Sequence, residues 1–241
     1  MEIKGFIETS LIDWDGRLAA VLFLPGCNFR CPMCHNHQLV QHPEEVPTVD
    51  WGTVEAALAR HRGWIDGVVV TGGEPTIHAE LATLLRWIKQ LGLAVKLDTN
   101  GALPDVLGHL IGDRLVDYVA MDIKAPLDER YARAAGAKAD LGAIRRSIAL
   151  LMASGVGYEF RTTVLPLYMR KADVGSIGRE IKGAGLWALQ QYLPGHADAE
   201  TARRLWPYRD EILLAMREEG AAFVERCVVR GIETVAEGGA A

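Results

Sequence analysis

The sequence predicts an α/β fold, an incomplete TIM-like (β/α)6 barrel built from parallel strands. Short runs of apolar and β-branched residues alternate with longer stretches compatible with helix. The middle runs are continuously apolar, which is typical of parallel strands covered by helices on one face. The predicted strands are residues 18–24, 67–71, 94–98, 118–122, 158–164 and 188–193, and the predicted helices are 51–62, 79–91, 104–111, 141–153 and 172–184.

The whole chain, residues 1–241, is predicted to form a single domain. Residues 1–17 are expected to form an N-terminal hairpin or cap, and residues 18–196 the partial barrel. Residues 197–241 are expected to add a C-terminal extension with a helix at 206–219 and a strand at 222–230.

Composition and charge exclude several classes of protein. The chain has 26 Lys and Arg against 31 Asp and Glu, a net charge of −5, so nucleic acid is not expected as a partner. No apolar run approaches the length of a membrane span, and the first residues carry no apolar secretory segment. We therefore expect a cytoplasmic protein without a membrane partner.

Three of the four cysteines lie within eight residues, in the sequence LPGCNFRCPMCHN. Their spacing, C-x3-C-x2-C, suits a compact iron–sulfur cluster in which one iron keeps an open position. Spacing alone leaves a structural zinc site open, with His35 or His37 as the fourth ligand. Cys227 lies in an apolar, strand-like run, so we interpret it as a buried structural residue.

Polar residues follow three of the predicted strands. In a parallel barrel the carboxyl ends of the strands meet on one face, where sites form, so these residues are expected to lie together with the cysteine loop. Glycines there let a ligand approach the backbone, and converging charges are costly unless a ligand or ion uses them. The segments are GGEP at 72–75, DTNG at 98–101 and DIK at 122–124.

With Met33 before the last cysteine, the C-x3-C-x2-C motif resembles the signature of the radical S-adenosylmethionine (radical SAM) superfamily. The segment LPGCNFRCPMCHN resembles the corresponding segment in the activating enzymes of glycyl radical enzymes, of the anaerobic ribonucleotide reductase and pyruvate formate-lyase type. The likeness covers residues 5–196. It implies a 4Fe–4S cluster held by Cys27, Cys31 and Cys34, and S-adenosylmethionine at the open iron.

The resemblance further implies an oxidoreductase that cleaves S-adenosylmethionine reductively to a 5′-deoxyadenosyl radical. That radical would install a glycyl radical on a partner enzyme, with a flavodoxin or ferredoxin as electron donor. No catalytic protein residue is implied, because the radical derives from the cofactor.

The resemblance also implies a set of binding residues. Asp98, Thr99 and Asp122 would help to hold a monovalent cation. His196 belongs to the sequence LPGH, where Gly195 departs from the family's LPYH pattern. The implied cofactor-binding residues are Met33, His35, Gly72, Gly73, Glu74, Asp98, Thr99, Asp122, Ile123, Lys124, Arg161 and His196.

Two alternatives stay open from the sequence. The first is a radical SAM enzyme acting on a small molecule, in the manner of a deazaguanine synthase. The second is a zinc-binding interaction module without catalysis. The sequence does not name the target enzyme, the electron donor or the oligomeric state.

Overall fold

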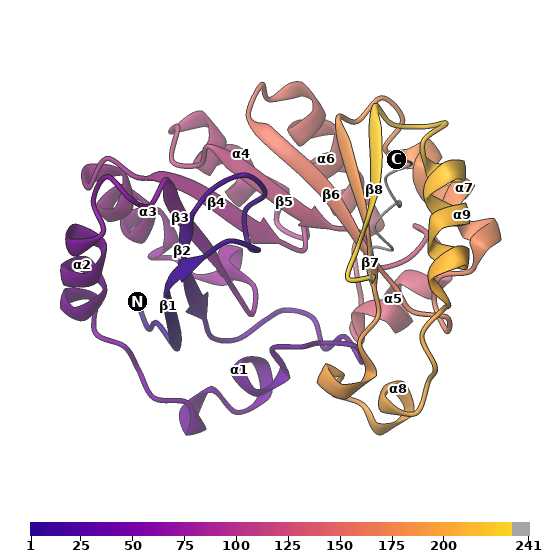
Figure 1. Cartoon of the computed structure of the whole chain (residues 1–241), viewed down its shortest axis with the longest axis horizontal. Helices are drawn as coiled ribbons and strands as arrows, with labels where there is room; N and C mark the ends of the chain where they lie inside the picture. Colours follow the sequence, from indigo (N-terminus) through magenta and orange to yellow (C-terminus); the bar gives the residue numbers. More distant parts are fainter. Residues whose placement is uncertain (233–241) are drawn as a thin grey trace, which may run out of the picture.

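The computed structural model describes residues 1–232, and residues 233–241 of the predicted extension lie outside the described part. Eight strands form one sheet in chain order (Figure 1). β1 runs antiparallel to β2, and every later neighbouring pair is parallel. The strands are β1 Gly5–Ser10, β2 Ala19–Leu24, β3 Gly67–Gly72, β4 Ala94–Thr99, β5 Tyr118–Asp122, β6 Gly157–Val164, β7 Leu186–Gln191 and β8 Arg226–Arg230.

The α/β class and the incomplete parallel barrel are confirmed. The six predicted parallel strands correspond to β2–β7, and β1 and β8 enlarge the sheet at its two edges. Within residues 1–232 these two edges do not pair with each other, so the barrel is not closed. An ion pair connects the two sides of the opening, from Arg230 on β8 to Asp15 in the loop between β1 and β2.

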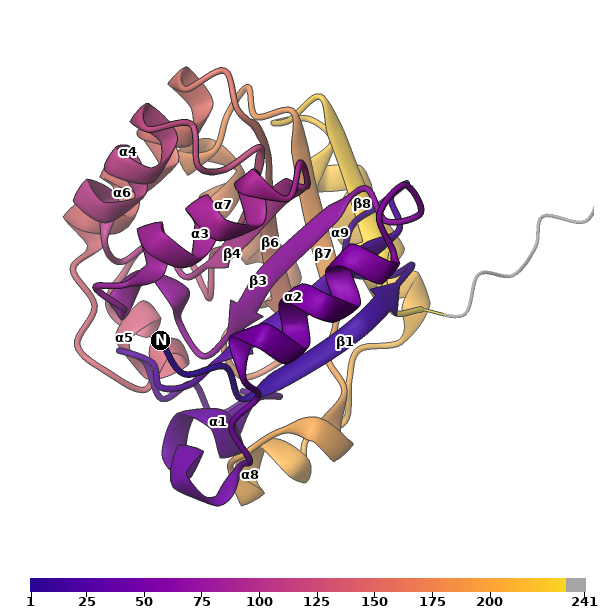
Figure 2. The ribbon, with the colours of Figure 1, turned by 90° about the vertical axis from the view of Figure 1, so that its left-hand side faces the viewer.

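Helices cover the outer face of the sheet (Figures 1 and 2). The α-helices are α1 His37–Gln41, α2 Trp51–Arg60, α3 Leu81–Gln90, α4 Pro104–Gly112, α5 Glu129–Ala135, α6 Leu141–Ala153, α7 Val174–Glu180, α8 Glu200–Arg203 and α9 Asp210–Gly220. Short 3-10 helices are η1 Pro43–Glu45, η2 Pro75–Ile77, η3 Lys171–Asp173 and η4 Pro194–His196. None of the helices in the described part is long and apolar enough to cross a membrane.

Some predicted boundaries were wrong. The strand predicted at 188–193 begins at Leu186 and ends at Gln191, because Pro194 opens η4 and the apolar residues before it belong to a loop. The helix predicted at 172–184 divides into η3 and the shorter α7. The strand predicted at 222–230 starts only at Arg226, because residues 221–225 form the turn that ends α9.

The two faces of the strands differ in chemistry. Val70, Leu97 and Phe160 are fully buried in the main core between the sheet and its helices. The opposite, inward face of β2 and β3 is also apolar, and Val21 and Val69 pack there against Trp14. On β4, β5 and β6 the inward positions instead carry charged residues, which are described below.

The cysteine loop that follows β2 is tied to the end of β3 through the backbone. The amide of Gly73 donates to the carbonyl of Leu24, and the amide of Glu74 donates to the carbonyl of Gly26, both at 2.8 Å. A Cβ atom at residue 73 would lie 1.7 Å from the Gly26 carbonyl oxygen. A glycine is therefore required at this position by backbone packing, independently of any ligand.

Two later segments complete the support of the cysteine loop. The amide of Arg30 donates to the carbonyl of Ala135 at 2.8 Å, at the end of α5. Gly136 caps this helix with a φ of +61°, and a Cβ there would lie 1.9 Å from the Arg30 carbonyl oxygen. The amide of Ala199, just before α8, donates to the carbonyl of Pro32 at 3.0 Å. The loop is thus held from three parts of the chain.

We expect the substitution Gly73→Ala to lower the free energy of unfolding by about 1–3 kcal/mol, because the added methyl group must push the β3 turn away from the cysteine loop. Chemical denaturation of the cluster-free protein measures this change. Gly112→Ala is the matched control, since a Cβ at this helical position meets no atom within 4 Å and should leave stability unchanged or slightly raised. Equal stabilities of the two variants would contradict the expectation.

Candidate active site

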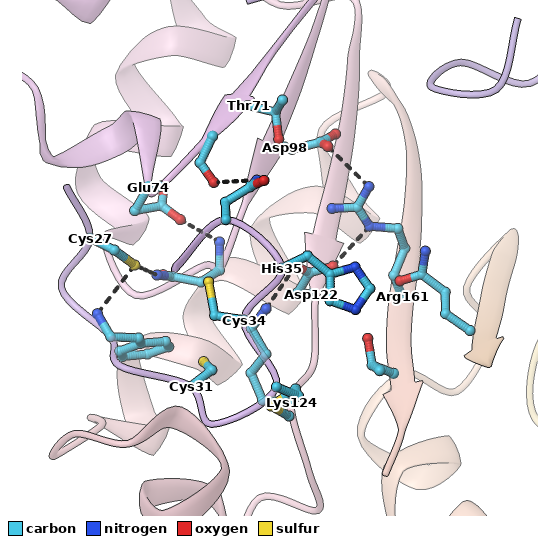
Figure 3. A pocket seen from close by; sticks show the side chains of 18 of the residues that line it. Cys27, Cys31, Cys34, His35, Thr71, Glu74, Asp98, Asp122, Lys124 and Arg161 are labelled. Carbon is cyan, nitrogen blue, oxygen red and sulfur yellow. Dashed lines mark hydrogen bonds and ion pairs between the residues drawn. The ribbon is translucent and has the colours of Figure 1, made fainter. Parts of the chain in front are cut away.

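A cavity of about 340 Å³ opens at the carboxyl ends of the parallel strands (Figure 3). It collects residues from the cysteine loop and from strands β3 to β8. Thirteen of the fifteen residues predicted from the sequence line it: Cys27, Cys31, Met33, Cys34, His35, Gly72, Gly73, Glu74, Asp98, Thr99, Asp122, Lys124 and Arg161.

The three thiols stand at one side of this cavity. Cys31 is buried, and Cys27 and Cys34 are half-buried. Desolvation raises the pKa of all three thiols, and that of Cys31 to about 11. The free thiols are therefore protonated near neutral pH, and any metal or cluster that binds them must displace their protons.

The spacing of these sulfur atoms bears on the kind of metal centre. Four ligands of one tetrahedral zinc ion, each thiolate about 2.3 Å from the metal, stand about 3.8 Å apart. Within residues 1–232, no three thiol or imidazole atoms of the cysteine loop lie within 4.8 Å of one another. Thiolates that bind different irons of a 4Fe–4S cluster stand farther apart, so the loop fits a cluster better than a single ion.

Glu74 links the ends of β3 and β4. It is 1% exposed, and its carboxylate accepts hydrogen bonds from the amide and hydroxyl of Thr76, from the hydroxyl of Thr99 at 2.8 Å and from the amide of Asn100 at 2.6 Å. Burial raises the pKa of Glu74, and these donors oppose that effect. Three of these donors share Oε1 and one binds Oε2, so Glu74 fixes its neighbours while Oε2 retains acceptor capacity.

Arg161 on β6 lies between two carboxylates, Asp98 on β4 and Asp122 on β5 (Figure 3). Its Nη1 is 3.1 Å from Asp98 Oδ2, and its Nε is 2.8 Å from Asp122 Oδ1. Lys124 Nζ contacts the other oxygen of Asp122 at 2.8 Å. Burial raises the pKa of Asp122, but the charges of Arg161 and Lys124 outweigh it and hold that pKa well below its usual range.

One oxygen of this group is left over. Asp98 Oδ1 is the buried side-chain polar atom that lacks a hydrogen-bond partner among residues 1–232. An unpaired carboxylate oxygen is costly in a protein interior unless a bound group uses it. The Asp98 side chain lines the cavity, but this oxygen has almost no exposed surface and faces the Lys96 ammonium group at 3.8 Å. The cavity therefore receives the negative charge of Asp98 and not an open oxygen.

Two predicted residues lie outside the cavity lining. Ile123 is fully buried, and its backbone amide donates to the Arg161 carbonyl at 2.8 Å. His196, in η4, faces His35 with 5.3 Å between ring centroids, so it stands behind a lining residue.

The structure also adds cavity residues that the sequence interpretation missed. Asn100 donates through Nδ2 to Asn28 Oδ1 at 2.7 Å and so connects the end of β4 to the cysteine loop. Asn100 lies in the DTNG segment next to the predicted residues Asp98 and Thr99, and this position could have indicated a place at the cavity. The additional lining residues are Phe29, Asn36, Val40, Thr71, Asn100, Thr163, Gln190, Gln191, Leu193, Arg230 and Gly231.

Comparison with known proteins identifies the class of protein that this fold and site define. The model of the radical SAM superfamily matches residues 21–173, which include the cysteine loop and the ends of β3, β4 and β5. The chain belongs to the radical SAM superfamily.

Individual relatives agree with this assignment. The chain is 31% identical over 237 residues to a Methanocaldococcus jannaschii protein named "Putative glycyl-radical enzyme activating enzyme", covering 95% of this chain and 96% of that protein. It is 37% identical over 92 residues to the 7-carboxy-7-deazaguanine synthase of Hyperthermus butylicus, covering 38% of each. Streptococcus suis SuiB bound to its precursor peptide SuiA shares the fold, with a TM-score of 0.63, 13% identity, and coverage of 88% of this chain and 48% of SuiB.

We expect Arg161→Gln to destabilise the protein at neutral pH by on the order of 2 kcal/mol, because two largely buried carboxylates lose a charged partner. The pKa of Asp122 is lowered in the folded protein, so its favourable contribution is present above the ordinary carboxyl pKa and is lost on acidification. The difference between variant and unaltered protein should therefore shrink as the pH falls below about 4. Denaturant unfolding across pH measures it.

Arg145→Gln is the control for this experiment. Arg145 pairs with Glu180 on the protein surface, so its loss should cost less at every pH. A destabilisation by Arg161→Gln that grows on acidification would contradict the expected sign.

Proposed function

We propose that this protein binds a 4Fe–4S cluster and S-adenosylmethionine in the cavity at the carboxyl ends of the strands, and that it activates a glycyl radical enzyme. The observation that carries the proposal is the sharing of one cavity by three thiols, paired glycines and the Asp98–Arg161–Asp122–Lys124 group. When bound, the cluster supplies one electron that cleaves S-adenosylmethionine to methionine and a 5′-deoxyadenosyl radical.

The residues of the chain hold, orient and enclose the reactants in this proposal. Cys27, Cys31 and Cys34 provide three thiolates and leave one iron for the cofactor. Gly72 and Gly73 let the cofactor approach the backbone closely. No side chain has to act as a general acid or base, because transfer of a hydrogen atom from a glycine Cα leaves no charge to neutralise.

The charged group at the strand ends suits the amino-acid end of S-adenosylmethionine. Arg161 and Lys124 offer positive charge to its carboxylate, and Asp98 offers negative charge to its ammonium group or to a monovalent cation beside it. In this proposal Thr99 and Asp122 assist in holding the cation. Met33, His35, Ile123 and His196 complete the cofactor site in the family pattern.

The activating role is supported by similarity along nearly the whole chain to a protein named as a glycyl-radical enzyme activating enzyme. The opening of the barrel between β1 and β8 favours a macromolecular substrate, since a peptide segment needs an open approach. A flavodoxin or ferredoxin is the proposed electron donor. The second candidate is a small-molecule reaction, favoured by the shorter match to a 7-carboxy-7-deazaguanine synthase.

The first expected result concerns the cluster. Anaerobic reconstitution should give about four iron and four sulfide per chain and a brown chromophore, because three thiolates hold one cubane. Single substitutions of Cys27, Cys31 or Cys34 by Ala should lose most of the iron and abolish formation of 5′-deoxyadenosine from S-adenosylmethionine. Cys227→Ala is the matched control and should retain both, because this buried cysteine packs beside Trp187 and Gly220, away from the cavity. Binding of one zinc per chain without a chromophore would contradict the proposal.

The second expected result concerns the target. Mixing the reduced, reconstituted protein with S-adenosylmethionine and a glycyl radical enzyme from the same organism should yield the doublet of a glycyl radical in electron paramagnetic resonance. The Cys34→Ala variant should give no doublet. If 5′-deoxyadenosine forms but no candidate partner shows the glycyl radical doublet, the small-molecule reaction becomes the better assignment.

A further inference from the structure

A buried ion pair lies inside the barrel below the cavity and takes no part in the proposed chemistry. Lys96 on β4 is 3% exposed and Glu159 on β6 is 2% exposed. Lys96 Nζ and Glu159 Oε1 are 3.5 Å apart, and neither residue lines the cavity. Because burying two charges is costly, this pair needs a compensating role or a dense set of contacts.

Lys96 is close to the free oxygen of Asp98 but is bonded elsewhere. Its Nζ donates to the backbone carbonyl of Asp13 at 2.5 Å. The same nitrogen is 3.8 Å from Asp98 Oδ1, which is too far for a hydrogen bond. A shift of roughly 1 Å would bring the ammonium group into hydrogen-bond range of that oxygen.

Glu159 is held in place by a second contact. Arg230 Nη2, from the last strand, donates to Glu159 Oε2 at 2.6 Å and to Asp15 Oδ2 at 2.7 Å. Asp13 and Asp15 both belong to the loop between β1 and β2. That loop therefore fixes Lys96 through a carbonyl group, and it fixes Glu159 indirectly through Arg230.

Charges of opposite sign alternate from the loop between β1 and β2 to the cavity. Asp15, Arg230, Glu159, Lys96 and Asp98 follow one another with opposite signs, and Arg161, Asp122 and Lys124 continue the order to the cavity. Removing one negative member leaves its cationic neighbour with one partner fewer and draws that neighbour toward the carboxylate that remains. For Lys96, the nearest remaining carboxylate is Asp98.

We propose that Glu159 is a positioning residue that draws Lys96 away from Asp98, so that the Asp98 carboxylate keeps its negative charge available to a cationic ligand in the cavity. The ligand is the ammonium group of S-adenosylmethionine or a monovalent cation, and to this extent the inference rests on the proposed function. A lysine ammonium on a flexible stem can rotate its donors to a new acceptor, so losing Glu159 lets Lys96 bind Asp98 Oδ1 more closely and neutralise the charge that the ligand needs.

The first test measures the binding of S-adenosylmethionine to the reconstituted protein by anaerobic titration calorimetry. Glu159→Gln keeps the shape of the side chain and removes its charge, and we expect it to weaken binding roughly tenfold, the equivalent of one charged hydrogen bond. The double variant Glu159→Gln/Lys96→Met should restore affinity to near that of the unaltered protein, because the competing ammonium group is gone. Lys96→Met alone should not weaken binding.

Glu180→Gln is the matched control, since it also removes a carboxylate paired with an arginine but lies on α7, away from the barrel interior. It should leave affinity unchanged. A loss of folding alone would not be rescued by removing Lys96 as well, so the rescue separates positioning from general destabilisation. Unchanged affinity in Glu159→Gln, or a double variant as weak as the single one, would overturn the inference.

The second test uses the cluster-free protein and potassium ions. Thermal unfolding in potassium chloride is compared with that in choline chloride at equal ionic strength. A stabilisation by potassium that Glu159→Gln abolishes and the double variant regains identifies a monovalent cation as the ligand. Weaker binding of S-adenosylmethionine without any potassium effect identifies the ammonium group instead.

The two proposals can fail separately. A potassium effect that depends on Glu159, in a protein that never cleaves S-adenosylmethionine, would overturn the proposed function and keep the positioning role. Cleavage of S-adenosylmethionine, with no change in the binding of either ligand in Glu159→Gln, would overturn the positioning role and keep the proposed function.

Discussion

The pairing of charge inside the barrel is the constraint on which the site depends. The inward positions of β4, β5 and β6 carry Lys96, Asp98, Asp122, Glu159 and Arg161, where a closed barrel would carry aliphatic side chains. Each of these charges is tolerated because an opposite charge from the inward face of the same sheet lies beside it. The parallel register of β4, β5 and β6 therefore determines the geometry of the cavity as much as the residues of the cysteine loop do.

The Gly-Gly-Glu-Pro segment has a structural role as well as a proposed ligand-binding role. Gly73 packs its backbone against Gly26 so closely that no side chain fits, and Glu74 accepts hydrogen bonds from Thr99 and Asn100 at the end of β4. The same residues thus join the cysteine loop to β3 and β4. A cofactor contact at this segment is best expected from backbone groups, with Glu74 maintaining their arrangement.

The sequence was sufficient for the class of fold and for most of the cavity. The six parallel strands were predictable because buried parallel strands are apolar throughout, and polar strand ends pointed to one face. The missed parts depend on long-range contacts: Arg230 and Gln190 reach the cavity only through the positions of β7 and β8. Helix α5 was missed although Asp128 and Gly136 cap it, because seven residues give little periodicity. The role of Lys96 followed from its distance to three oxygen atoms, which spacing along the chain does not encode.

The order of the sheet has a consequence for synthesis of the protein on the ribosome. Each strand pairs with its predecessor, so the barrel can assemble progressively from its N-terminal end. The cysteine loop follows the second strand, yet Arg30 and Pro32 obtain their backbone partners only from Ala135 and Ala199. The thiols are therefore made early and enclosed late, and during that interval the nascent chain presents three unprotected cysteines. For the proposed cluster, this interval leaves the thiols open to iron and sulfide before the second half of the chain closes over the loop.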